Sequence, residues 1–149
     1  MKIAGRCLCG HVTYRAEIDP ERVAVCHCMD CQIHSASAFG VVAGIVGEFE
    51  LLTGSMKTFV KTADSGTKRA LTFCPKCGTR IYAKTVGEGS DFWGLRVGTI
   101  NQRAELQPRI QVWCDSALPW VNELRDLPGL PQQAGLAQGA GSGLVPVRP

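Results

Sequence analysis

The sequence has little net charge, no long apolar run and no recognisable targeting segment. Its 16 basic and 13 acidic residues leave a net charge of +3, which is too small to indicate a nucleic-acid partner by itself. No stretch approaches the roughly 20 apolar residues that a membrane helix needs. The residues up to Arg6 lack the apolar region of a signal peptide. These absences predict a cytoplasmic protein with no membrane partner and argue against nucleic acid.

The sequence also has little helical periodicity. Apolar residues instead alternate with polar ones, as expected for strands with one buried face. The predicted strands are 12–18, 39–45, 49–51, 70–73, 92–97 and 110–113. Turn-forming residues separate them, including Asp19-Pro20 and Gly47. A short helix is predicted from Cys28 to Ser35, and a brief turn after Asn101. This pattern predicts a mostly β fold of antiparallel strands with short helical turns.

The chain changes composition near Pro131. The residues that follow are mainly Gly, Ala, Gln and Ser, with Arg148 as their only charge. Such a composition buries too little apolar surface to fold independently. We therefore expect one domain over 1–131 and a flexible Gly/Ala-rich tail over 132–149.

Cysteine, in contrast, is abundant. Seven of the eight cysteines fall in three tight groups. Closely packed thiolates repel one another unless a cation neutralises them, and zinc is the cation that such groups usually bind. Disulfides are a weaker interpretation because the cytoplasm keeps thiols reduced. The groups are Cys7 with Cys9, Cys26 with Cys28 and Cys31, and Cys74 with Cys77.

The first and third groups resemble two halves of one metal site. Each is a short turn with two thiols, and a glycine follows directly, Gly10 in one and Gly78 in the other. Glycine allows φ > 0, so the chain can fold back and point backbone N–H groups at the sulfurs. Two such pairs would give the closed four-sulfur arrangement of a structural zinc. Unliganded core cysteines and a redox C-x-x-C remain alternatives. The predicted structural zinc ligands are Cys7, Cys9, Cys74 and Cys77.

The second group offers only three cysteines, Cys26, Cys28 and Cys31. Three protein ligands plus one open position are typical of a catalytic zinc, and an open zinc binds a thiol as thiolate at neutral pH. A fourth protein ligand from His27, His34 or Cys114 would instead close the site. Cys114 continues an apolar strand face, so we expect a buried core thiol there. His34 lies one helical turn after Cys31 and is a candidate pocket residue.

The cysteine motifs resemble those of the glutathione-dependent formaldehyde-activating family, whose eukaryotic relatives include centromere protein V. The motifs are C-x-C-G from Cys7, C-H-C-x-x-C from Cys26 and F-C-P-x-C-G from Phe73. The later segments V-G-T-I from Val97 and A-L-P-W from Ala117 are also similar to family motifs. The resemblance covers about residues 3–130.

The resemblance implies a β-tent fold of curled antiparallel sheets. It implies a structural zinc on the first and third groups, and on the second group a labile zinc that glutathione reaches through its thiol. The implied reaction is addition of glutathione to formaldehyde, which belongs to the carbon–sulfur lyase class. We expect two zinc sites, the second only partly occupied, and a small-molecule thiol or thiol adduct as partner.

The sequence departs from the family pattern after Cys31. Family members commonly have two basic residues there, whereas this chain has Gln32 and Ile33. Glutathione carries two carboxylates, so other cations would have to replace them. The sequence offers four candidates between residues 57 and 69, namely Lys57, Lys61, Lys68 and Arg69.

Three functions are compatible with these patterns. The leading one is a zinc-dependent carbon–sulfur lyase-like enzyme acting on thiol adducts of small aldehydes, with Cys26, Cys28 and Cys31 at the metal and His34 as candidate acid or base. The second is a non-enzymatic zinc module that binds a protein or nucleic acid. That function would favour a basic stripe with interleaved aromatics, but segment 57–69 contains only Phe59 and is interrupted by Asp64. In the third, both zincs are structural and a pocket takes another small molecule.

Overall fold

The computed structural model describes residues 1–63, 65–87 and 92–129. The chain divides into two compact units, 1–117 and 118–149. The predicted tail 132–149 lies outside the described residues. In the second unit the described part contains one 3₁₀ helix, η4 (Pro119–Asp126). The metal-site candidates all belong to the first unit.

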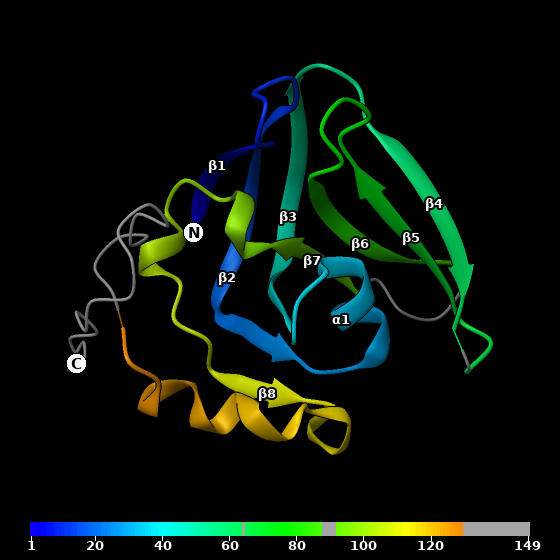
Figure 1. Ribbon diagram of the computed structural model, residues 1–149. Coiled ribbons are helices and arrows are strands. Elements are labelled where there is room, and N and C mark those ends of the chain that lie inside the picture. Colours follow the sequence, from blue (N-terminus) through cyan, green and yellow to red (C-terminus); the bar gives the residue numbers. More distant parts are fainter. Residues whose placement is uncertain (64, 88–91, 130–149) are drawn as a thin grey trace, which may run out of the picture. The chain divides into compact units, whose positions relative to one another are not determined.

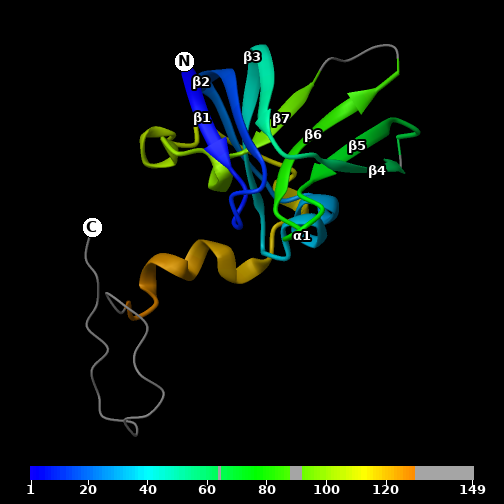
Figure 2. The ribbon, with the colours of Figure 1, turned by 90° about the horizontal axis from the view of Figure 1, so that it is seen from above.

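Eight strands form a single sheet in the first unit (Figure 1). They are β1 (Lys2–Arg6), β2 (Thr13–Cys26), β3 (Gly40–Thr53), β4 (Lys57–Thr62), β5 (Lys68–Phe73), β6 (Arg80–Val86), β7 (Trp93–Arg96) and β8 (Ile110–Val112). The strand order is β1-β2-β3-β7-β6-β5-β4, and β8 pairs with β2. Every pairing is antiparallel except that of β8. Figures 1 and 2 show β4, β5 and β6 at an angle to β1, β2 and β3, so the sheet is curled.

The predicted mostly β, antiparallel fold is confirmed, but two predicted turns are wrong. Asp19-Pro20 lies inside β2 and Gly47 lies inside β3. The pairing of these two strands shifts register between Asp19 and Val23, so an irregularity in a long ladder takes the place of a turn. Strands β1, β4 and β6 were not predicted. β1 and β6 border the cysteine turns, and β4 lacks strict alternation.

The helices of the first unit are short. The α-helix α1 (Met29–Ser35) confirms the predicted helix, with Cys28 as its N-cap. Its C-cap, Ala36, has a φ of 47°, the left-handed conformation that often ends helices. Three 3₁₀ turns follow β7, namely η1 (Val97–Thr99), η2 (Arg103–Glu105) and η3 (Cys114–Ser116), and β8 lies between the last two. The turn η2 agrees with the one predicted after Asn101.

Aromatic side chains from four neighbouring strands, β2, β3, β7 and β6, pack together at the core. The Phe49 ring centroid lies 5.1 Å from those of Tyr14 and Tyr82 and 5.7 Å from that of Trp93. The Tyr14 hydroxyl, fully buried, is 2.7 Å from the Thr99 hydroxyl. Gly5 lies against the Tyr14 ring and the Thr99 carbonyl, where a Cβ would clash. This packing fixes the backbone beside the first cysteine group.

Candidate metal centre

The first cluster consists of Cys7, Cys9, Cys74 and Cys77. Their four sulfur atoms all lie within 4.8 Å of one another. The sulfurs of Cys9 and Cys74 are 3.9 Å apart although 65 residues separate them along the chain. Four thiols at this spacing are a donor set that suits zinc, since thiolates are soft ligands that form tetrahedral sites. The structure thus brings together the two halves that the sequence predicts as one site.

The backbone around this cluster has the predicted glycine turns. Gly10 and Gly78 have φ of 76° and 72°, values that side-chain-bearing residues rarely adopt. The Val12 N–H donates to the Cys7 sulfur at 3.2 Å. The Thr79 hydroxyl lies 3.1 Å from the Cys77 sulfur. That hydrogen bond is the main cause that lowers the pKa of Cys77 to about 5, so the turn favours a thiolate.

The second cluster consists of Cys26, Cys28 and Cys31, with their sulfurs also within 4.8 Å of one another. Cys26 ends β2, and Cys28 caps α1 by accepting a hydrogen bond from the Cys31 N–H at 3.4 Å. The three thiols therefore lie close together, because one is at the end of a strand and the other two are at the start of the helix that follows. Within the part of the chain that the structure describes, no fourth Cys, His, Asp or Glu atom joins this cluster.

Arg96, at the end of β7, supports the second cluster and was not predicted. Its side chain is 8% exposed. Nη1 lies 3.8 Å from the Cys31 sulfur, and Nη2 lies 2.8 Å from Nδ1 of His34. The pKa of Cys31 is lowered to about 5. The hydrogen bond from Cys26 is the larger cause, and the charge of Arg96 also contributes. The sequence feature that could have indicated this contact is the presence of an arginine within the otherwise apolar segment 92–97.

His34 lies beside the second cluster through this contact. A guanidinium group only donates hydrogen bonds, so Nδ1 of His34 accepts and Nε2 carries the proton. Nε2 is buried and has no hydrogen-bond partner among the residues that the structure describes. Burial, followed by the charges of Arg96 and Arg80, lowers the pKa of His34 to about 4. The imidazole is therefore neutral near pH 7, with one unpaired N–H group.

The other two candidate fourth ligands lie elsewhere. His27 is buried, and its Nε2 atom lies 2.8 Å from the Gln111 side-chain oxygen. Cys114 is exposed, so the expectation of a buried core thiol is wrong. The strand β8 ends at Val112, and Trp113 then adopts a φ of 61°. Ile110 is exposed as well, so the strand face that Cys114 was expected to continue is not part of the core.

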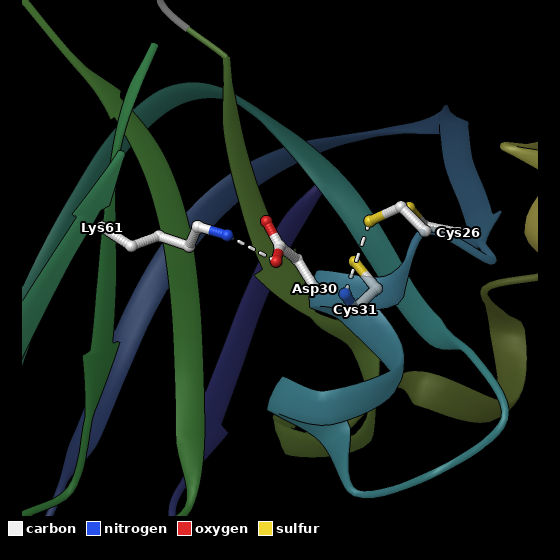
Figure 3. A network of polar contacts seen from close by, with 5 residues as sticks. Cys26, Asp30, Cys31 and Lys61 are labelled. Atoms are coloured by element: carbon white, nitrogen blue, oxygen red, sulfur yellow. Dashed lines mark hydrogen bonds and ion pairs between the residues drawn. The ribbon is translucent and has the colours of Figure 1, made fainter. Parts of the chain in front are cut away.

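Two of the candidate cations of segment 57–69 make different contacts. Lys61 Nζ on β4 is 2.6 Å from a carboxylate oxygen of Asp30 on α1 (Figure 3). That contact joins the far strand of the sheet to the helix that carries Cys31. Arg69 donates to the Thr85 hydroxyl at 2.8 Å. The pKa of Arg69 is lowered, mainly by desolvation, while the charge of Cys31 opposes this shift.

Comparison with known proteins identifies the family. A family model described as glutathione-dependent formaldehyde-activating enzyme matches residues 2–116. No curated protein is significantly similar to the chain. Among solved structures, a Rhodobacter sphaeroides protein superposes with a TM-score of 0.55 at 17% sequence identity, over 74% of this chain and 100% of that one. At this identity the likeness shows the fold alone. No described helix is long and apolar enough to cross a membrane.

The family model covers most of the first unit, including both clusters and Arg96. Two groups of thiols able to hold metal ions, the curled antiparallel sheet and this match agree with one another. The chain belongs to the glutathione-dependent formaldehyde-activating enzyme family.

Proposed function

We propose that this protein is a zinc-dependent carbon–sulfur lyase-like enzyme that acts on glutathione-type thiol adducts of small aldehydes, formaldehyde among them. One observation carries the proposal. The first cluster offers four thiols, whereas the second offers three and has no fourth Cys, His, Asp or Glu ligand among the described residues. A site with three protein ligands keeps a position for a substrate atom.

The two clusters have different roles in this proposal. Cys7, Cys9, Cys74 and Cys77 hold a structural zinc that joins the start of the chain to the turn between β5 and β6. Cys26, Cys28 and Cys31 hold the second zinc. When bound, that zinc supplies a Lewis acid that keeps a substrate thiol ionised near neutral pH. The reducing cytoplasm, where both clusters stay as thiols, is the compartment that fits this chemistry.

The reaction forms one carbon–sulfur bond in one direction and breaks it in the other. In synthesis the thiol gives up its proton, its sulfur bonds to the aldehyde carbon, and the aldehyde oxygen takes a proton to become a hydroxyl. In the lyase direction the hydroxyl loses its proton, the carbon–sulfur bond breaks, and thiol and aldehyde are released. Negative charge develops on the aldehyde oxygen, so a hydrogen-bond donor near that oxygen favours both directions.

His34 is our candidate for that donor. Arg96 fixes the proton on Nε2 by donating to Nδ1, and no described residue accepts a hydrogen bond from the Nε2–H group. A buried, unpaired N–H group is unfavourable, so a ligand oxygen that accepts from it is stabilised. His34 acts here as a neutral donor and not as an imidazolium acid, because its pKa is lowered to about 4.

Zinc stoichiometry and thiol binding test this function. Wild type should bind two zinc ions by elemental analysis, one held weakly, and isothermal titration should show saturable binding of reduced glutathione. Cys26→Ser and Cys31→Ser should each lose the weak zinc together with thiol binding. The matched control is Cys114→Ser, because that thiol is exposed and outside both clusters. Two equally tight zinc ions with no response to thiols would refute the enzyme proposal.

A further inference from the structure

A single residue, His27, stands between the first two thiols of the second cluster. It follows Cys26 at the end of β2 and precedes Cys28 at the N-cap of α1. Because peptide units are planar, the chain between these two cysteines consists of two rigid units joined at His27. The N–H group of His27 belongs to the first unit and its carbonyl group to the second. Contacts that hold these two groups therefore fix how the two thiols lie relative to each other.

Both peptide groups of His27 are held, each by a different element. The N–H group donates to the Val112 carbonyl of β8 at 3.0 Å. The carbonyl group accepts from the side-chain Nε2 of Gln32 in α1 at 2.6 Å. His27 is 1% exposed, so water does not readily replace these partners. Loss of either contact leaves a buried peptide group unpaired, which is unfavourable.

The Gln32 side chain makes a second contact through the same nitrogen atom. Nε2 also donates to the Ser116 carbonyl of η3 at 2.8 Å, across 84 residues of chain. A side-chain amide carries two N–H groups, and here each has a carbonyl acceptor. The amide of Gln32 therefore ties α1 both to the 26–28 loop and to the segment that follows β8.

The helix α1 in turn fixes Gln32 relative to the other two ligands. The Gln32 backbone N–H donates to the Cys28 carbonyl at 3.0 Å. The Cys31 N–H donates to the Cys28 sulfur at 3.4 Å. The helix thus sets the positions of Cys28 and Cys31, and the Gln32 side chain connects it to the loop that leads back to Cys26.

A second glutamine supports the same loop from β8. The side-chain oxygen of Gln111 lies 2.8 Å from Nε2 of His27, and it accepts because an amide oxygen cannot donate. The strand β8 has only three residues and pairs with β2 at Ala24–Cys26 (Figure 1). Side-chain contacts therefore add to a short ladder, and segment 110–116 and the second cluster support each other.

We propose that Gln32 is a positioning residue of the second metal site. Its side-chain amide holds the 26–28 loop against α1 and segment 112–116, and this keeps the three thiols in the arrangement that retains zinc. The inference rests on the proposed function only for the presence of a zinc ion on the second cluster. Family members commonly have a basic residue at this position, whereas this chain has an amide.

The expected effect follows from how metal sites are organised. The three sulfurs lie within 4.8 Å of one another, so the donor set is already arranged for one ion. A donor set that is arranged in advance loses less conformational entropy when it binds. Removing a contact that orients metal ligands typically weakens metal binding by about 10–100-fold. Loss of the Gln32 amide should therefore weaken the second zinc and spare the first.

The test is competition between the zinc-loaded full chain and a chromogenic chelator, which gives the affinity of each zinc ion. Gln32→Leu removes both N–H donors. Gln32→Glu keeps the size and shape of the side chain, but a carboxylate cannot donate to the two carbonyls. The matched control is Gln107→Leu, because Gln107 is exposed and precedes β8. Cys26→Ser identifies the second zinc, and circular dichroism verifies the fold of each variant.

We expect Gln32→Leu and Gln32→Glu each to weaken the second zinc about tenfold, while the first zinc stays as in wild type. A purely structural role would weaken both zinc ions together. Cobalt(II) in place of zinc gives a second measurement, because its visible absorption depends on the geometry of the thiolate ligands. The bands that Cys26→Ser removes should change in Gln32→Leu and stay unchanged in Gln107→Leu.

Two results would overturn the positioning role. One is a second zinc held as tightly by Gln32→Leu and Gln32→Glu as by wild type. The other is an equal weakening of both zinc ions in these variants.

The positioning role and the proposed function fail separately. If Gln32→Leu weakens the second zinc while wild type does not bind reduced glutathione, the positioning role stands and the enzyme function falls. If wild type binds two zinc ions and glutathione and Gln32→Leu matches it in both, the function stands and the positioning role falls. A wild-type chain that takes up one zinc ion from excess zinc would overturn both.

Discussion

Metal removal should test whether the first cluster holds the fold together. A zinc ion on Cys9 and Cys74 closes a loop of 65 residues. Loop-closure entropy predicts that such a cross-link stabilises the folded state by about 4 kcal/mol. The second cluster closes a loop of about five residues, from Cys26 to Cys31, for which the same relation gives about 2 kcal/mol. The first zinc should therefore contribute roughly twice as much to stability as the second.

The assay is urea unfolding with saturating zinc and with a chelator. Chelation should lower the free energy of unfolding of wild type by the sum of both contributions. Cys9→Ser should remove the larger part of that zinc-dependent difference, and Cys31→Ser the smaller part. Cys9 is a suitable position, because its thiol is exposed and its sulfur lies 3.6 Å and 3.9 Å from those of Cys7 and Cys74.

With chelator present, Cys9→Ser and wild type should unfold at nearly the same urea concentration, since neither then holds a zinc ion on the first cluster. Cys114→Ser should match wild type under both conditions. If Cys9→Ser destabilises the protein equally with and without zinc, the loop-closure reasoning is refuted.

Three further predictions concern the fold around the site. Gly5→Ala should destabilise the protein by about 2 kcal/mol in urea unfolding, because its Cβ meets the Thr99 carbonyl. The control is Gly98→Ala, whose Cβ meets nothing within 4 Å and which should be close to neutral. An equal loss of stability in both variants would contradict the described packing. Unfolded histidine binds a proton near pH 6.5, whereas the pKa of His34 in the folded chain is about 4. Metal-free wild type should therefore lose more stability than His34→Gln as pH falls through that window, and parallel curves would argue against a buried imidazole. Burial raises the pKa of Tyr14 from 10.0 to about 12, although its hydrogen bond to Thr99 opposes the shift. Stability should fall as pH rises through that range, and ultraviolet titration showing Tyr14 ionised in the folded chain near pH 10 would contradict this.

The sequence by itself determined the mostly β fold and the grouping of the cysteines. Both depend on local patterns, namely strand alternation and thiols two or three residues apart followed by a glycine. The turns at Gly10 and Gly78 have the expected positive φ, because only a few neighbouring residues decide that geometry. The helix from Met29 to Ser35 was also predictable, since its cap and its length are local.

Only the tertiary structure decided what surrounds the second cluster. The Arg96 guanidinium reaches Cys31 and His34 across 65 and 62 residues of chain. Four arginines from four separate elements, Arg6, Arg80, Arg96 and Arg103, line one cavity. Cys114 continues an apolar strand face that the structure leaves exposed, since Ile110 is exposed as well. The residues within a short segment determine the geometry of a metal-ligand turn. Buried charges and cavities instead arise from contacts between segments that are distant in the sequence, and no local sequence pattern indicates such contacts.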